Sequence, residues 1–477
     1  MITFDELVRH YPQGKQVQAS TVAQRVAASR RVLIVLDDDP TGTQSVADLP
    51  VLTGWAVQDL IWALQEEKPA VYVMTNSRSL DAREAAIRNR EIVTASLEAS
   101  RQSGIPVDFV SRSDSTLRGH FPLETDTIAA CLAERAGRHV DAVVIVPAFP
   151  EAGRITVGGV HYAGSVAEGF TPVGETEFAK DCTFGYENSD LREWVAEKTQ
   201  GQYRSTQVVS ITLDVLRSGP AAVAELLQPL QGCRPVVVDI VEENDLRILA
   251  LGLDLAEQTG KVLLYRVGPP FVRGRIGQEV HPPLGDLEVA RICAGGIGAS
   301  TIGGLVVVGS HVALTTRQLD VLRDRRAPNE IEIDVAAVLD HTHRDAHLAA
   351  VVRDAVDNLA WGNVVVGTSR VLFASHDGRS SLEIARSVSA AVVNVVQRVL
   401  AARPPRFVIA KGGITSSDVA THGLSLRRAV VHGPMLPGIV SLWEPSDGPA
   451  RGIPFIVFAG NVGDEQSLAD VVDKLSA

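Results

Sequence analysis

The stretch Val32–Leu36 (VLIVL), followed at once by Asp37-Asp38-Asp39-Pro40-Thr41-Gly42-Thr43-Gln44, sets the pattern for the first half of the chain. Short apolar runs with polar residues behind them recur at Val71–Met74, Val107–Val110 and Val143–Val146. Stretches with helical spacing lie between them, such as Ala82–Gln102. Apolar runs that do not alternate with polar residues are typical of parallel strands, which are buried on both faces. We therefore predict a mainly parallel sheet flanked by helices.

The second half of the chain repeats this pattern. Its candidate strands are Leu305–Val308, Ile331–Ile333, Val364–Val366, Phe407–Ala410 and Phe455–Phe458, and Ser387–Ala402 is a candidate helix. Between the halves, proline and glycine interrupt the pattern in HPPLGD and CAGGIGASTIGG, as is typical of a linker. The predicted fold is α/β with two domains, each with a mainly parallel sheet flanked by helices: residues 1–275, a linker region 276–300, and residues 301–477.

Charge and composition exclude several classes of function. Lys and Arg number 45 against 57 Asp and Glu, a net charge of -12, which disfavours nucleic acid or an anionic membrane as a general partner.

The four cysteines form no CxxC pair, so we expect reduced thiols. The first residues, MITFDELVRHYPQG, do not form a secretory signal, and no apolar run approaches the roughly 18 residues of a membrane span. We expect a cytoplasmic protein.

Four strand ends in the first half supply hydroxyls, carboxylates and arginines. They are Asp37–Gln44, Thr75–Ser79 with Arg78, Ser111–Gly119 with Arg112, Asp114 and Arg118, and Pro147–Arg154. In open α/β sheets, ligands bind beyond the carboxyl ends of the strands. Arginine grips carboxylates in bidentate fashion, and Asp, Ser, Thr and Asn hydrogen-bond to hydroxyls, so the pattern favours a small sugar acid. The alternative is that these residues only terminate strands and solvate loops.

The three consecutive aspartates have several roles open to them. They could hold Mg²⁺, which takes oxygen ligands. One could act as general base toward an alcohol. One could simply cap the following turn or helix.

Strand ends in the second half carry small residues instead. They are Gly309-Ser310, Gly367-Thr368-Ser369, Lys411-Gly412-Gly413-Ile414-Thr415-Ser416-Ser417 and Ala459-Gly460-Asn461-Val462-Gly463. Glycine lets backbone N–H groups approach phosphate oxygens, so these loops predict a nucleotide phosphate site, although ordinary βα turns use the same residues. The sequence contains no GxxxxGK[ST], clean GxGxxG or GxSxG motif. For His341, His343 and His347 we favour a surface helix start over a metal site.

These motifs resemble those of the four-carbon acid sugar kinase family, whose members phosphorylate erythronate, threonate or 3-oxo-tetronate with ATP. The resemblance rests on DD-x-TG at Asp38–Gly42, DST-x-RG at Asp114–Gly119, PAFPEAGR, FAKDCTFGYENSDL with Asp181 and Ser189, VVVGS followed by Thr315 and Gln318, KGG-x-T and GN-x-G. It implies an N-terminal sugar-acid domain and a C-terminal nucleotide domain. Ile414 and Val462 depart from the family pattern.

From the loops and the resemblance together, we expect an ATP-dependent kinase that uses Mg²⁺. The candidate catalytic residues are Asp38, Asp114 and Arg118, with Asp38 or Asp114 as base or metal ligand. The candidate substrate-binding residues are Asp39, Thr41, Arg78, Arg112, Ser115, Thr116 and Arg154, with the sugar-acid carboxylate on Arg78, Arg118 or Arg154. The candidate nucleotide-binding residues are Ser310, Lys411, Gly412, Gly413, Ile414, Thr415, Gly460, Asn461 and Gly463.

Two other classes of function remain as alternatives. One is a dehydrogenase or aldolase acting on sugar acids, because α/β folds host such enzymes too. The other is a non-catalytic protein that binds nucleotide or sugar acid, or acts as an effector. A homodimer is the default expectation for the assembly.

Overall fold

The computed structural model describes residues 1–369 and 378–477, and no side chain of residues 378–383 or of Ile414. The chain divides into two compact units, Met1–His281 (unit 1) and Pro282–Ala477 (unit 2). Each unit has a set of neighbouring strands and a hydrophobic core of its own.

The sheet of unit 1 is parallel throughout, with the strand order β2-β3-β1-β4-β11-β5-β10-β9. Its strands are β1 (Val32–Asp37), β2 (Leu49–Leu52), β3 (Ala70–Met74), β4 (Val107–Arg112), β5 (Ala142–Val146), β9 (Val209–Ile211), β10 (Arg234–Val238) and β11 (Leu263–Val267). Every residue of β1, β3, β4 and β5 is buried. The four strands predicted from the first half are therefore confirmed.

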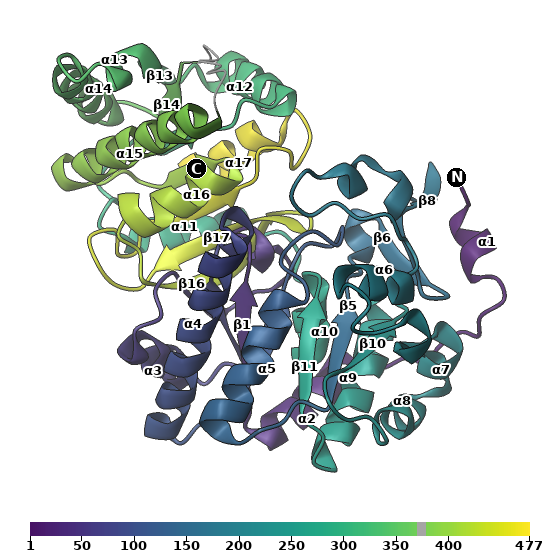
Figure 1. The fold of residues 1–477 in the computed structure, drawn as a ribbon. Helices are drawn as coiled ribbons and strands as arrows, with labels where there is room; N and C mark the ends of the chain where they lie inside the picture. Colours follow the sequence, from purple (N-terminus) through teal and green to yellow (C-terminus); the bar gives the residue numbers. More distant parts are fainter. Residues whose placement is uncertain (370–377) are drawn as a thin grey trace. The chain divides into compact units, whose positions relative to one another are not determined.

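Helices cover both faces of this sheet (Figure 1). One layer contains α3 (Val57–Gln65), α4 (Ala82–Ser103) and α5 (Leu123–Ala136), which pack in series. The other layer is built around α9 (Glu243–Gln258), which packs against α2 (Ala19–Ser29), α8 (Pro220–Leu227) and α10 (Pro270–Ile276). The remaining helices of unit 1 are α1 (Phe4–Val8), α6 (Leu191–Lys198) and α7 (Leu213–Ser218).

The limits of α4 follow from its sequence. Asp81 is the N-cap, and its side chain accepts a hydrogen bond from the backbone N–H of Glu84. Gly104 ends the helix in the left-handed conformation, with φ 71°. The buried positions Ala85, Asn89, Ile92, Val93, Ser96 and Ala99 recur at helical spacing. The predicted helix Ala82–Gln102 is one residue shorter than the observed one.

A small antiparallel sheet follows β5 along the chain, separate from the main sheet of unit 1. Its strands β6 (Arg154–Val157), β7 (Val160–Ser165) and β8 (Gly169–Pro172) were not predicted. Gly158 and Gly159 form the two-residue turn between β6 and β7, and both have positive φ. This sheet begins at Arg154, one of the candidate substrate-binding residues.

The sheet of unit 2 has the order β13-β14-β12-β15-β18-β17-β16. Its parallel strands are β12 (Leu305–Val308), β13 (Asn329–Ile333), β14 (Val364–Thr368), β15 (Val408–Lys411) and β18 (Phe455–Phe458). All five were predicted. The sequence did not predict the antiparallel strands β16 (Arg428–Leu436) and β17 (Ile439–Pro445), which lie beside β18.

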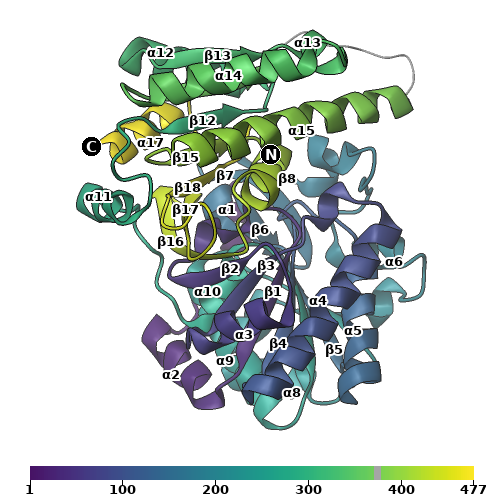
Figure 2. The ribbon, with the colours of Figure 1, turned by 90° about the vertical axis from the view of Figure 1, so that its left-hand side faces the viewer.

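Helices flank the unit 2 sheet as well (Figure 2). They are α11 (Asp286–Gly295), α12 (Ala313–Arg326), α13 (Val335–Leu339), α14 (Arg344–Leu359), α15 (Gly378–Ala402), α16 (Gly413–Asp418) with the π-helical turn Val419–Gly423, and α17 (Ser467–Ser476). The predicted linker region 276–300 contains α11, which contacts α17 and buries Val289, Ile292 and Cys293 in the core of unit 2.

One segment has the length and apolar composition of a membrane span, Ile384–Ala402 within α15. The expectation that no such run exists is therefore wrong. Its buried residues Ala391, Val392, Val395, Val396, Val399 and Leu400 recur at helical spacing. A helix that covers a sheet needs such an apolar face, so packing within unit 2 accounts for this composition.

Candidate functional site

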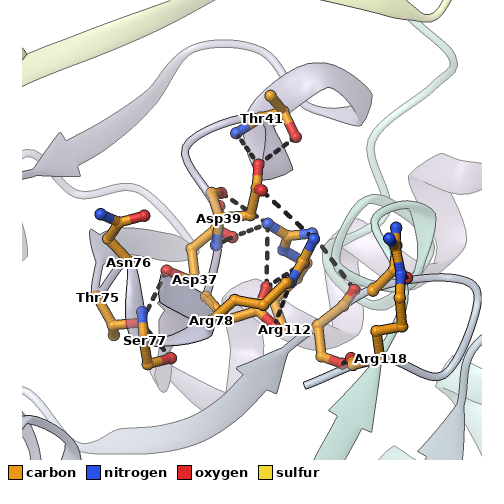
Figure 3. Close-up of polar contacts among 12 residues, drawn as sticks. Asp37, Asp39, Thr41, Thr75, Asn76, Ser77, Arg78, Arg112 and Arg118 are labelled. Atoms are coloured by element: carbon orange, nitrogen blue, oxygen red, sulfur yellow. Dashed lines mark hydrogen bonds and ion pairs between the residues drawn. The ribbon is translucent and has the colours of Figure 1, made fainter. Parts of the chain in front are cut away.

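The predicted polar rim of unit 1 gathers at three adjacent strands. Because β3, β1 and β4 are neighbours and run parallel, their carboxyl ends place the segments 37–41, 75–79 and 112–118 side by side (Figure 3). The carbonyl oxygen of Asp37 accepts hydrogen bonds from the backbone N–H and the hydroxyl of Thr75. The segments are thus tied together as well as adjacent.

Arg112 lies buried beneath this rim. Its Nη2 forms an ion pair with Asp37 and donates to the carbonyl oxygen of Asp39 at 2.7 Å. Burial raises the pKa of Asp37 to about 7, against the opposing charge of Arg112. Arg112 was predicted to bind substrate, but only 3% of its surface is exposed, and it is engaged with the loop that follows β1.

Arg78 joins the other two aspartates. Its Nη2 lies 2.6 Å from Asp38 Oδ1, its Nε lies 3.2 Å from Asp38 Oδ2, and its Nη1 lies 3.3 Å from Asp39 Oδ2. The other oxygen of Asp39 accepts from the backbone N–H of Thr41 at 2.9 Å and from its hydroxyl at 2.5 Å. Although burial opposes the shift, the charges of Arg78 and Arg112 lower the pKa of Asp39.

The three aspartates therefore do not converge on one point. Asp37 pairs with Arg112, Asp38 pairs mainly with Arg78, and Asp39 contacts Arg78 and Thr41. No group of three acidic, histidine or cysteine side chains that could hold a metal occurs in residues 1–369 and 378–477. The sequence left open a Mg²⁺ site made by this triplet, and that role stays a hypothesis; the structure shows these carboxylates paired with Arg78 and Arg112. His343, considered as a ligand, lies exposed directly before α14.

The DST segment forms a tight loop after β4. Arg118 Nε donates to Asp114 Oδ2 at 2.7 Å, and the Thr116 hydroxyl donates to the same oxygen. Although burial opposes it, the charges of Arg78 and Arg118 hold the pKa of Asp114 well below its usual range. Leu117 and Gly119 have φ of 69° and 118°, so the loop requires the left-handed region at two positions.

Side chains from outside the rim fix the backbone of this loop. His161 Nε2 lies 2.8 Å from the carbonyl oxygen of Ser115, and the Tyr186 hydroxyl donates to that of Thr116 at 2.7 Å. His161 is fully buried, and its Nδ1 lies 2.9 Å from the hydroxyl of Thr156. Burial lowers the pKa of His161 to about 4, so the neutral ring donates from Nε2 and accepts at Nδ1.

Two further arginines lie over one aromatic ring. The guanidinium carbon of Arg118 is 5.7 Å from the ring centre of Phe178, and that of Arg154 is 5.4 Å from it. Phe178 belongs to the single-turn helix Glu177–Lys180. Contacts of this kind attract a cation to the ring face.

Sequence reasoning missed four residues of this site: Phe178, His161, Tyr186 and Glu124. Glu124 is buried at the start of α5, where it pairs with Arg266 and accepts from the Ser77 hydroxyl at 2.5 Å. Phe178 and Tyr186 do lie within FAKDCTFGYENSDL, the segment already noted as similar to the family. Their aromatic character there was the one signal that could have pointed to them.

In unit 2, three of the predicted phosphate loops converge. Backbone N–H of Gly309 donates to the carbonyl of Lys411, and that of Gly412 donates to the carbonyl of Phe458. The hydroxyl oxygen of Thr315 lies 3.1 Å from that of Ser310 and 3.0 Å from the Gly460 carbonyl oxygen. Ser310, Gly412 and Gly460 are thus brought together.

Glycine is required at several of these positions. A Cβ on Gly309 would collide with the Thr415 hydroxyl, and one on Gly460 would collide with the Ser310 hydroxyl. Gly412 and Gly463 have φ of 127° and 84°, which L side chains rarely adopt. The Gly463 turn is held by Gln318, whose Nε2 donates to the carbonyls of Val462 at 3.1 Å and Asp464 at 2.7 Å.

Lys411 has a different position from the one expected. It is fully buried, its Nζ donates to the carbonyl of Ala459 at 2.7 Å, and it lies 3.8 Å from the ring centre of Phe458. Burial lowers the pKa of Lys411 to about 7. The side chain therefore links the loop after β15 to the loop after β18. Among the other candidates, Asn461 is exposed, and the side chain of Ile414 lies outside the described residues.

A cavity of about 380 Å³ adjoins Ser310. Its polar lining comes from Ser310, His311, Arg323, Glu330, Glu332 and Thr368, and its apolar lining includes Val308, Leu319 and Val365. Carboxylates and hydroxyls at this position offer acceptors for hydroxyl groups.

Comparison with known domain families assigns different ligands to the two halves of the chain. Residues 33–275 match a family described as a sugar-binding N-terminal domain, and residues 305–468 match one described as a nucleotide-binding C-terminal domain. Curated relatives of the chain are named as D-erythronate, D-threonate and 3-oxo-tetronate kinases. The chain belongs to the four-carbon acid sugar kinase family. The resemblance drawn from the motifs is confirmed, and so is the two-domain α/β fold.

Members of this family in other bacteria are distant but extend over most of the chain. The D-threonate kinase of Bordetella bronchiseptica is 27% identical over 91% of this chain and 95% of its own length. The D-erythronate kinase of Heliobacterium modesticaldum is 27% identical over 69% of this chain and 68% of its own length. The solved structure of Haemophilus influenzae protein HI1011 is similar in fold, with a TM-score of 0.62 and 18% identity over 92% of this chain and 98% of the other.

Proposed function

We propose that this protein transfers a phosphoryl group from ATP to a hydroxyl of a small sugar acid, of the four-carbon class. The single observation that carries the proposal is the cluster of hydroxyl, carboxylate and guanidinium groups formed by the ends of β1, β3 and β4 together with Arg154, which shares the Phe178 ring with Arg118; a molecule with both hydroxyls and a carboxylate finds partners for each there. Since its relatives act on different stereoisomers, the identity of the acid is part of the test.

In unit 1, we assign the orientation of the acceptor hydroxyl to Asp114 and Asp38. Both carboxylates pair with arginine, and each has oxygens that can accept a hydrogen bond from a hydroxyl, although burial raises the pKa of Asp38. In phosphoryl transfer the transition state is loose, and positioning matters more than base strength. Asp39, Thr41, Ser115 and Thr116 belong to the loops after β1 and β4 and would bind the remaining hydroxyls. Arg118 would hold Asp114 in place.

In unit 2, we assign the phosphates of the nucleotide to Ser310, Gly412, Gly413, Thr415, Gly460 and Gly463. The support is the cradle at Gly309, Gly412 and Gly460, where added side-chain atoms would collide with hydroxyls or require a strained backbone. The cavity beside Ser310 would take the nucleoside, with Glu330 and Glu332 as acceptors for ribose hydroxyls. Lys411 would position the two glycine loops.

Mg²⁺ normally accompanies ATP and neutralises charge on its phosphates. The described part of the chain has no cluster of three metal-ligating side chains, so the ion would be held largely by the phosphates.

A kinase with these substrates is expected to work in the cytoplasm. A homodimer stays a prediction, and light scattering checks it.

An ADP-release assay tests the proposal. The protein is mixed with ATP, Mg²⁺ and a panel of aldonic and keto-acids of three to six carbons. We expect turnover with one or more four-carbon acids and not with the corresponding polyols. Asp114→Ala should abolish it while leaving the circular dichroism spectrum unchanged. Stabilisation by sugar acids alone, with no ADP release and no effect of ATP on melting, would instead favour a binding protein.

A further inference from the structure

Phe178 connects two arginines that come from different parts of unit 1. Arg118 follows the DST segment, and Arg154 begins β6 of the small antiparallel sheet. Both guanidinium groups lie over the Phe178 ring, at 5.7 Å and 5.4 Å from its centre. The ring therefore fixes the positions of two positive charges at once, at one edge of the predicted sugar-acid site.

The four arginines of this site differ in how far their charge is already neutralised. Arg78 and Arg112 are each in ion pairs with two aspartates. Arg118 pairs with Asp114, and its Nη1 lies 3.8 Å from Asp181.

Arg154 is different. Its Nη1 donates to the carbonyl of Ala152, and its Nε is buried without a partner. Within residues 1–369 and 378–477 no carboxylate lies at ion-pair distance from it. Burial lowers the pKa of Arg154 against the opposing charge of Asp114, and the neighbouring charge of Arg118 lowers it further. A half-buried guanidinium with spare donors and no counter-ion is a site for an anion.

We propose that Arg154 binds the carboxylate of the sugar acid, and that Phe178 is a positioning residue that holds Arg154 and Arg118 for this contact. The inference rests on the proposed function for the identity of the anion. It narrows three candidate arginines to one, because Arg78 is bound to Asp38 and Asp39 and Arg118 to Asp114. It also orients the substrate, with the carboxylate at Arg154 and the hydroxyls toward the DST segment.

The proposed contact between Arg154 and the carboxylate predicts an effect on substrate preference that a general loss of structure would not produce. Removing Arg154 should weaken binding of a carboxylate but not of its neutral amide. We expect Arg154→Ala to raise KM for the sugar acid roughly a hundredfold, the usual size for a hydrogen-bonded charge, with KM for ATP unchanged. KM for the corresponding sugar amide should stay the same, so that the preference for acid over amide disappears.

Phe178 gives a graded series. Phe178→Ala frees both arginines and should raise KM for the acid roughly tenfold, a loss of the order of the cation–π contacts. Phe178→Tyr keeps the ring and should restore the wild-type acid-to-amide ratio. Arg101→Ala is the matched control, because this exposed arginine on α4 pairs only with Glu98 one helical turn away. It should leave every constant unchanged.

Thermal shifts with the sugar acid alone separate this inference from the proposed function. The acid should raise the melting temperature of the wild type and of Phe178→Tyr, but not of Arg154→Ala. If Arg154→Ala keeps the wild-type preference for acid over amide, or is stabilised equally by the acid, the carboxylate contact is wrong while kinase function stands. If the wild type releases no ADP with any acid yet is stabilised by one in an Arg154-dependent way, the proposed function fails and the contact stands. If Arg154→Ala does not fold, Arg154→Gln, which keeps a hydrogen-bonding side chain but removes the charge, gives the same comparison.

Discussion

Both carboxylate oxygens of Asp38 are engaged by one guanidinium group, with Arg78 Nη2 at 2.6 Å from Oδ1 and Arg78 Nε at 3.2 Å from Oδ2. Asp38 is almost completely buried, so its charge depends on this contact. Arg78 reaches Asp39 as well, which makes it the bridge between two neighbouring carboxylates. Loss of Arg78 would leave both without their main counter-ion.

Arg78→Ala should therefore destabilise the fold strongly. Breaking a buried pair by removing one partner typically costs about 3 kcal/mol, because the remaining charge is left uncompensated. Arg78→Lys keeps the charge but cannot bond both oxygens of Asp38 and reach Asp39, so we expect an intermediate loss. Urea denaturation measures both. The exposed pair Arg101–Glu98 provides the control, since Arg101→Ala should change the free energy of unfolding by less than about 0.5 kcal/mol. Equal midpoints for Arg78→Ala and wild type would contradict the bridge.

Asp114→Asn should lower kcat at least roughly a hundredfold and leave KM for ATP unchanged. The amide keeps the shape of the carboxylate but loses the charge that anchors Arg118 and orients the hydroxyl. Asp181→Asn is a close comparison, because Asp181 also faces Arg118 but at 3.8 Å and with more exposure. Its effect should be much smaller. Steady-state kinetics with ATP varied at saturating sugar acid give kcat and KM for ATP of each variant. Similar losses of kcat in the two variants would contradict a specific role for Asp114.

The fold was largely predictable because its central strands are buried on both faces. VLIVL, LVVV and FIVF have no alternation, and each forms a buried strand with a parallel neighbour. The antiparallel strands were harder. Residues 154–172 combine short strands with glycine turns, and a pattern of this length does not distinguish a hairpin from a loop.

The site was predictable only where chemistry follows a strand directly. Asp38, Arg78 and Asp114 each come within a few residues of a strand end, so the topology brings them together. Phe178 belongs to a turn that is far along the chain from any strand of the main sheet. No spacing rule therefore places its ring next to Arg118. The partners of Asp37–Asp39 were not predictable for a similar reason, since Arg78 and Arg112 come from other strands; the Mg²⁺ role of the triplet stays a hypothesis.

Gly412→Ala should raise KM for ATP roughly tenfold and leave KM for the sugar acid unchanged. At φ 127° an alanine is strained by about 1–2 kcal/mol, so the loop after β15 would relax and its N–H groups would move. Gly438→Ala is the matched control, because Gly438 also has positive φ, at 67°, and open space around it, but lies in the turn between β16 and β17. If both variants affect KM for ATP equally, general loss of stability and not loop geometry is responsible.

His161 should make the stability of unit 1 depend on pH in acid. Its pKa is about 4 in the folded protein and near 6.5 when unfolded, so between these values the unfolded chain binds the extra proton. The free energy of unfolding should therefore fall by about 3 kcal/mol from pH 6.5 to pH 4 on account of this residue. His161→Gln removes the titration, so the stability difference between wild type and variant should shrink by that amount on acidification. Tyr186→Phe also removes a bond to the DST loop, but burial raises the pKa of Tyr186 further above this range, and its stability difference should stay constant. Urea denaturation at a series of pH values measures these differences. If the difference in free energy of unfolding between wild type and His161→Gln does not vary between pH 7 and pH 4, the buried imidazole does not resist protonation.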